Sequence, residues 1–127
     1  MSADVWLQDE HGEPIVHTDD PDAQMRDVVP MRCPGQVTAT GFNLTYNLTG
    51  MLAAAGMPPW QDLLGQRAAD AGTVWRAVHA ALVADPDRFR GHNPENGWGT
   101  YEDAVEVIGA LADACERHPQ ATVGGWL

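Results

Sequence analysis

One amphipathic segment near the C-terminal end constrains the fold of this chain more than any other. Apolar residues recur there at helical spacing, at Tyr101, Ala104, Val105, Ile108, Leu111, Ala112 and Cys115. Thr100 and Asp103 are spaced as in a capping box, with Asp in place of the usual Glu or Gln, and Pro119 ends the segment. Because such a stripe has to be buried against another layer, the pattern predicts a helix from Tyr101 to about Arg117 that packs on a core.

A segment with the opposite periodicity supplies the second layer. Between Val37 and Leu48, apolar residues alternate with polar or small ones, which predicts a strand with one apolar face. Shorter strands are predicted at 5–7 and 122–126, and the return at 15–17 suggests a hairpin with the first of them. The sequence therefore predicts an α+β fold, in which a small, mainly antiparallel sheet packs against about three helices that form a single layer on one face.

Helical signals fill much of the remaining chain. A short helix is expected from Thr49 or Gly50 to Ala55, where Gly56 stops it. The segment 60–71 is prone to form a helix but is interrupted at Gly65. We further expect a helix capped by Thr73 and ending near Ala84, with one face formed by Trp75, Val78 and Leu82. Loops are predicted at 88–99 and, with the alternative of a weak helical turn, at 19–27.

The length and the composition indicate one domain, residues 1–127. The 127 residues contain no internal repeat and no linker long enough to separate two domains. No apolar run approaches the roughly 18 residues that a membrane span needs, and residues 1–10 lack the features of a secretory signal. We therefore expect a cytoplasmic protein without membrane association.

The formal net charge of −11 is concentrated at the two ends of the chain. Residues 1–30 hold eight acidic residues against one arginine, residues 31–99 are balanced at five and five, and residues 100–127 hold five acidic residues against one arginine. This distribution argues against direct nucleic-acid binding, which requires clustered basic residues. It is compatible with a basic protein partner, and Glu106 and Asp113 are then candidate contacts. The alternative is that the charge only keeps the protein soluble.

Asn43, Thr45 and Asn47 occupy alternate positions of the predicted central strand. Asparagine is disfavoured in strands, so two asparagines on one face call for an explanation. One interpretation is a row of neutral donors and acceptors that lines a shallow ligand site. The other is a solvated sheet face, or asparagines that hydrogen-bond to nearby backbone groups.

The segment 92–101 is a second candidate site, with Asn93, Asn96, Trp98 and Tyr101 as its candidate contacts. Asn96 and Gly97 suit a tight turn. Trp98 lies between two glycines, so it either anchors the loop on the core, which is the interpretation we favour, or forms an exposed contact. Loops that carry aromatic and amide side chains are common binding surfaces.

Motifs of catalysis and metal binding are missing from the sequence. The five histidines are scattered, and neither HxxxH nor CxxC spacing occurs. There is no glycine-rich phosphate loop and no GxSxG elbow, so we predict no metal, no cofactor and no catalytic residues, although an acid–base pair assembled in space would leave no such trace. Cys33 and Cys115 are expected to be reduced thiols, with Cys115 in the core.

Two of these motifs carry a resemblance to a known group. The segment from Thr45 to Met51, together with Asn-Pro-Glu-Asn-Gly-Trp-Gly-Thr-Tyr-Glu at 93–102, resembles small proteins of actinobacterial phages over roughly residues 40–123. The resemblance implies a phage or prophage setting in a bacterial cytoplasm and implies no mechanism.

The sequence leaves three functional hypotheses open. The first is a non-enzymatic, acidic binding protein that docks on, or inhibits, a host or phage macromolecule. The alternative is a small-ligand-binding domain or small enzyme that uses Asn43, Thr45, Asn47 and the 92–101 loop. The third is a structural role in a phage particle or a homo-oligomer.

Overall fold

The structure is a computed structural model that describes residues 2–17 and 36–127. Its sheet has four strands in the order β2-β3-β1-β4, and every neighbouring pair is antiparallel. The strands are β1 (Ser2–Gln8), β2 (Gln36–Val37), β3 (Phe42–Thr45) and β4 (Thr122–Trp126). The loop expected at 19–27 and the surroundings of Cys33 lie outside the described residues.

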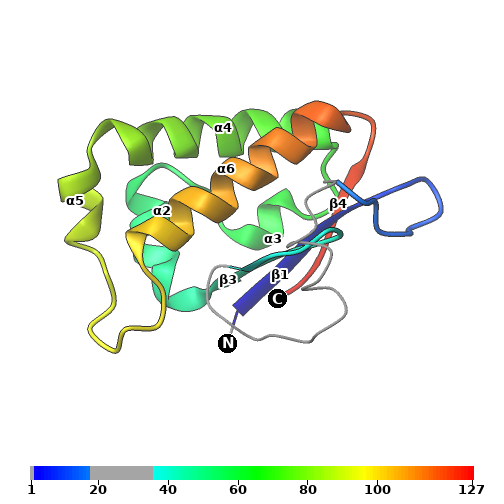
Figure 1. Cartoon of the computed structure of the whole chain (residues 1–127). Helices are drawn as coiled ribbons and strands as arrows, with labels where there is room; N and C mark the ends of the chain where they lie inside the picture. Colours follow the sequence, from blue (N-terminus) through cyan, green and yellow to red (C-terminus); the bar gives the residue numbers. More distant parts are fainter. Residues whose placement is uncertain (1, 18–35) are drawn as a thin grey trace.

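The helices of the described residues all lie on one side of this sheet (Figure 1). They are α2 (Thr49–Ala54), α3 (Trp60–Leu63), α4 (Ala68–Ala84), α5 (Pro86–Arg90) and α6 (Tyr101–Arg117), and a 3-10 turn η1 (Tyr46–Leu48) precedes α2. The predicted α+β class with a small antiparallel sheet is confirmed. The described part of the chain contains five helices rather than about three, because several are too short to be recognised by periodicity.

The alternation along β1 shows which face of the sheet the helices cover. Ala3, Val5 and Leu7 are each 1% exposed, whereas Asp4 between them is exposed. Successive side chains of a strand point to opposite faces, so the described helices cover the face of Val5, and none of them covers the face of Asp4.

Helix α6 begins at the predicted capping box. The Asp103 amide donates to Thr100 Oγ1 (3.2 Å), and the Thr100 amide donates to Asp103 Oδ2 (2.9 Å). Its predicted apolar residues are buried except Val105, which is half-buried, and Val107, Gly109 and Ala114 are buried as well. Burial therefore extends around most of the helix, which packs against both the sheet and α4 (Figure 1).

The central strand is shorter than predicted. β3 ends at Thr45, and the chain turns into η1 instead of continuing to Leu48. Thr45 Oγ1 accepts a hydrogen bond from the Asn47 amide (3.3 Å), which is the N-cap interaction of η1. Leu48 is still fully buried because the turn directs it into the core, so its apolar character did not require a strand.

The start of α4 was also predicted wrongly. The helix begins at Ala68, and Thr73 lies inside it, with its hydroxyl donating to the Ala69 carbonyl (3.1 Å). The first amides of α4 have partners from a distant segment, because Ala68 donates to the Ala121 carbonyl (2.8 Å) and Ala69 donates to the Pro119 carbonyl (3.2 Å). A tertiary contact thus replaces the side-chain cap that the sequence led us to expect.

Two further predictions need correction. Helix α5 occupies the start of the segment predicted as a loop at 88–99, and Phe89, which is 1% exposed, anchors it to the core. The predicted hairpin is reduced to a bridge between Gln8 and Pro14. β3 pairs with β1 from Ser2 to Val5, so only the last residues of β1 remain available to the returning segment.

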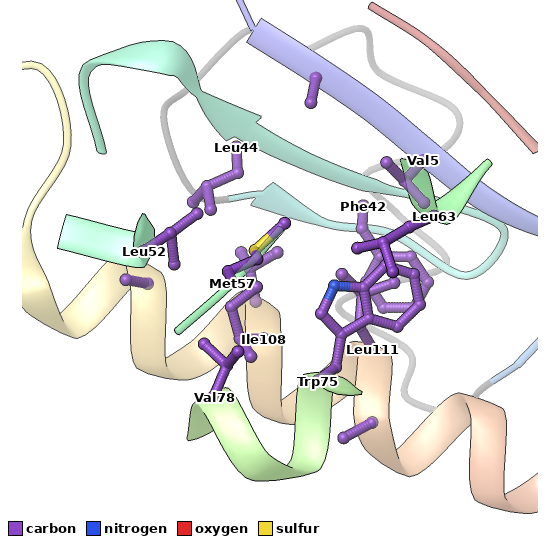
Figure 2. Close-up of a cluster of buried hydrophobic side chains, with 14 of the residues drawn as sticks. Val5, Phe42, Leu44, Leu52, Met57, Leu63, Trp75, Val78, Ile108 and Leu111 are labelled. Atoms are coloured by element: carbon purple, nitrogen blue, oxygen red, sulfur yellow. The ribbon is translucent and has the colours of Figure 1, made fainter. Parts of the chain in front are cut away.

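The buried side chains of the described residues form one cluster between the sheet and the helices. Figure 2 shows its centre, where residues of β3, α4 and α6 meet: Phe42, Leu44, Trp75, Val78, Ile108 and Leu111. Each large apolar side chain buried there stabilises the fold by about 1.5–3 kcal/mol. None of the helices in the described part of the chain has the length and apolar character required to cross a bilayer.

Candidate binding surface

The predicted row of Asn43, Thr45 and Asn47 does not form, because β3 ends at Thr45. Asn43 belongs to the sheet face of Asp4, where its Nδ2 donates to Ser2 Oγ (2.9 Å) and to Asp4 Oδ1. Thr45 is 8% exposed and caps η1. Asn47 is exposed within η1, so the three side chains do not share one strand face.

The 92–101 loop is held by its own side chains. Asn93 Oδ1 accepts from the Tyr101 amide (2.8 Å), and Asn96 Oδ1 accepts from the Trp98 amide (3.0 Å). Gly97 has φ +73°, the left-handed conformation that the Asn-Gly pair predicted. The two asparagines therefore act as braces of the loop backbone.

Tyr101 is an anchor rather than an exposed contact. It is 6% exposed, and its hydroxyl donates to the carbonyl of Leu82 at the end of α4 (2.8 Å). The Arg90 guanidinium lies 4.9 Å from the centre of its ring. Tyr101 thus fixes the junction between the loop and α6.

Gly99 joins the loop to η1. Its φ is +100°, and a Cβ atom at this position would lie 2.6 Å from Thr45 Cγ2 and 3.0 Å from Leu48 Cγ. Only glycine satisfies both the backbone conformation and this close approach. The segments 43–47 and 92–101 are therefore brought together. The contact is made by Gly99, which was not one of the candidate residues.

Trp98 is the exposed residue of this arrangement. Its exposed fraction is 57%, so the interpretation favoured from the sequence, that it anchors the loop on the core, is wrong. Gly99 occupies the place against Thr45 and Leu48, which leaves the neighbouring indole outside. Asn47 and Asn96 are exposed on the two joined segments, and we call Asn47, Asn96 and Trp98 the Trp98 surface.

A groove that the sequence analysis missed follows η1 and α2. It has a volume of about 360 Å³, and its lining includes Tyr46, Thr49, Met57, Pro58, Pro59 and Trp60. The Pro-Pro-Trp run at 58–60 is the local sequence signal of this groove. We call this cavity the Trp60 groove.

The two acidic candidates on α6 differ in their surroundings. Asp113 and Glu116 both pair with Arg76 of α4, and Arg76 Nε lies 2.9 Å from Glu116 Oε1. The hydrogen bonds that the Arg76 guanidinium donates to Glu116 and Asp113 raise its pKa. Glu106 is exposed and forms no ion pair with the described residues, so its charge is the less compensated of the two candidates.

No group of three or more His, Cys, Asp or Glu side chains in residues 2–17 and 36–127 is arranged to hold a metal ion. Cys115 is a free thiol, 1% exposed, in the core as predicted. Burial raises its pKa to about 12, which makes it a poor nucleophile.

Comparisons of the chain with protein-family models, with curated proteins and with solved structures found no match.

Proposed function

We propose that this protein is a non-enzymatic binding protein that docks on a protein partner through the Trp98 surface. The observation that carries the proposal is the 57% exposure of Trp98 on a loop with a braced backbone. Tryptophan is among the residues most enriched at the energetic centres of interfaces, where it fills a pocket of the partner. An indole held out from the surface suits that role.

The bracing of the loop supports the same proposal. Association has a cost when flexible segments become ordered at an interface. The hydrogen bonds of Asn93 and Asn96 and the contact of Gly99 with η1 already restrict this loop. A partner would therefore meet a Trp98 whose backbone needs little further ordering.

The charge of the protein favours a basic partner over nucleic acid. Glu95 is exposed in the loop itself, and Glu106 is exposed in the second turn of α6. With a net charge of −11, these carboxylates would repel a phosphate backbone and accelerate encounter with a positively charged protein. With the resemblance to phage proteins, this leads us to propose a host protein of the bacterial cytoplasm, inhibited by docking, as the partner.

The test is a comparison of two exposed tryptophans. The tagged protein captures its partner from a bacterial lysate, and the affinity of the purified pair is then measured. We expect Trp98→Ala to weaken binding by at least about 30-fold, which corresponds to the roughly 2 kcal/mol of an interface hot spot. The matched control is Trp126→Ala, because Trp126 is 75% exposed on β4 and lies outside the Trp98 surface.

Stability measurements separate binding from folding. Both substitutions should leave the melting temperature nearly unchanged, because neither indole is buried. Asn47→Ala should weaken binding several-fold with the same stability, because no hydrogen bond of its side chain to the described residues is lost. Binding that survives Trp98→Ala but fails with Trp126→Ala would show that the proposed surface is the wrong one.

A further inference from the structure

We propose that the Trp60 groove is a second, separate site, which binds a small neutral molecule that combines a planar apolar ring with a hydrogen-bond acceptor such as a carbonyl group. The ring lies against Tyr46 and Trp60, and the acceptor takes the indole N–H of Trp75. This inference does not depend on the Trp98 surface.

The size and the lining of the groove define the ring. Its volume of about 360 Å³ exceeds the roughly 150 Å³ that suffices for benzene in an apolar protein cavity and falls within the range of small-molecule sites. Its apolar lining includes two aromatic side chains and two prolines. Aromatic rings pack in offset or edge-to-face arrangements, so these walls favour a planar ring over an extended chain.

The buried indole of Trp75 defines the acceptor. Trp75 is 0% exposed, and its Nε1 has no hydrogen-bond partner among the described residues. Buried indole N–H groups normally find an acceptor, so this one requires an explanation. The ring of Trp75 lies 6.3 Å from that of Trp60 (centroid to centroid), so the unpaired donor belongs to a ring that neighbours the lining of the groove.

Met57 separates the groove from this donor. Figure 2 shows the nitrogen edge of Trp75 directed toward Met57, and Met57, 8% exposed, also lines the groove. Its unbranched side chain has three rotatable bonds and adapts readily. Contact between the ligand's acceptor and Trp75 Nε1 therefore requires a rotation of this thioether.

The side chains that line the groove also indicate the charge of the ligand. Within residues 2–17 and 36–127, the side chains that line the groove include polar ones, such as Thr49, but no charged one. An ionised ligand would lose its hydration without gaining a partner, so the ligand is neutral. A pure hydrocarbon would fill the groove and leave Trp75 unpaired, so the ligand carries an acceptor.

The test uses two probes of similar size that differ in one carbonyl group, acetophenone and ethylbenzene. The five tryptophans give five indole N–H signals in a ¹⁵N-labelled sample, and Trp→Phe substitutions assign them. Both probes should shift the signal of Trp60. Acetophenone alone should move the Trp75 signal downfield, and it should bind about 3–10-fold more tightly, which is the net value of one hydrogen bond.

Two variants test the donor and the path to it. Trp75→Phe removes the N–H and should make the two probes bind equally. If this variant fails to fold, Met57→Leu tests the same idea, since the swap is nearly isosteric and the branched side chain has fewer rotatable bonds than that of methionine. Acetophenone should then lose its advantage while the melting curve stays close to that of the parent.

Two results would overturn the inference. The groove is not a site if neither probe shifts the Trp60 signal. The acceptor is wrongly assigned if the probes bind the parent equally and the Trp75 signal stays in place. Trp98→Ala should bind both probes as the parent does, so failure here is distinguishable from failure of the proposed partner surface.

Discussion

Three glycines inside helices should respond differently to the same substitution, alanine. An added Cβ at Gly50 in α2 would meet no atom within 4 Å. At Gly109 in α6 it would lie 2.9 Å from Nε2 of the His79 ring, and at Gly72 in α4 it would lie 2.6 Å from the Cβ of Cys115. None of the three has a positive φ, so the surroundings of the new methyl group decide the outcome.

The magnitudes follow from two opposing effects. Replacing glycine by alanine inside a helix stabilises it by about 0.5–1 kcal/mol, because the unfolded chain loses freedom. At Gly72 the two Cβ atoms are fixed by their backbones well inside the 3.5–4.0 Å of favourable carbon contacts, so α4 and α6 have to move apart, which costs about 1–3 kcal/mol. We expect Gly50→Ala to stabilise, Gly72→Ala to destabilise by about 1–2 kcal/mol, and Gly109→Ala to lie near zero because the His79 ring can turn.

Urea denaturation monitored by circular dichroism measures all three. The midpoints should decrease in the order Gly50→Ala, Gly109→Ala, Gly72→Ala, with the parent between the first and the last. Adding Cys115→Gly to Gly72→Ala removes the opposing Cβ, so the loss from the pair should be smaller than the sum of the two single losses. A Gly72→Ala protein as stable as Gly50→Ala would refute the close approach of α4 and α6.

Three further predictions concern the cap, the buried thiol and the acidic helix. Thr100→Ala should lower the free energy of unfolding, measured in thermal melts, by about 1 kcal/mol because the capping box is lost. Thr73→Ala should change it by no more than about 0.5 kcal/mol, because Thr73 does not cap α4. Equal losses in the two variants would contradict the observed start of α4. The folded-state pKa of Cys115, about 12, lies above the roughly 8.5 of an unfolded thiol. The contribution of this thiol to stability is therefore complete below pH 8.5 and declines toward pH 12. The urea midpoint of the parent should decrease between pH 8 and pH 10, and Cys115→Ala should lack the part of this decrease that the thiol causes. If the acidic residues of α6 attract a basic partner, the association rate should fall as the salt concentration rises. Glu106→Gln should slow association more than Asp113→Asn, since Arg76 already pairs with Asp113. An association rate that does not change with salt would exclude electrostatic attraction of the partner.

The geometry of the 92–101 loop was predicted in part. Its tight turn at Gly97 followed from local turn chemistry, and Asn93 and Asn96 both hydrogen-bond to the backbone of the loop segment. The exposure of Trp98 did not follow, because it depends on which neighbour contacts η1. The Trp60 groove was missed because its walls come from separate turns of the chain.

What the sequence by itself determined is local. The α+β class, the start of α6 at Thr100 and the helix stops at Gly56 and Gly65 follow from periodicity, capping and backbone preference, which act among residues a few positions apart. The tertiary structure alone decided that Pro119 and Ala121 would complete the first turn of α4. It also decided that β1 would lie between β3 and β4, and that Gly99 would lie against Thr45. These contacts join residues far apart in the chain, and their selection depends on how all the apolar faces can be buried at once, a property that no single segment carries.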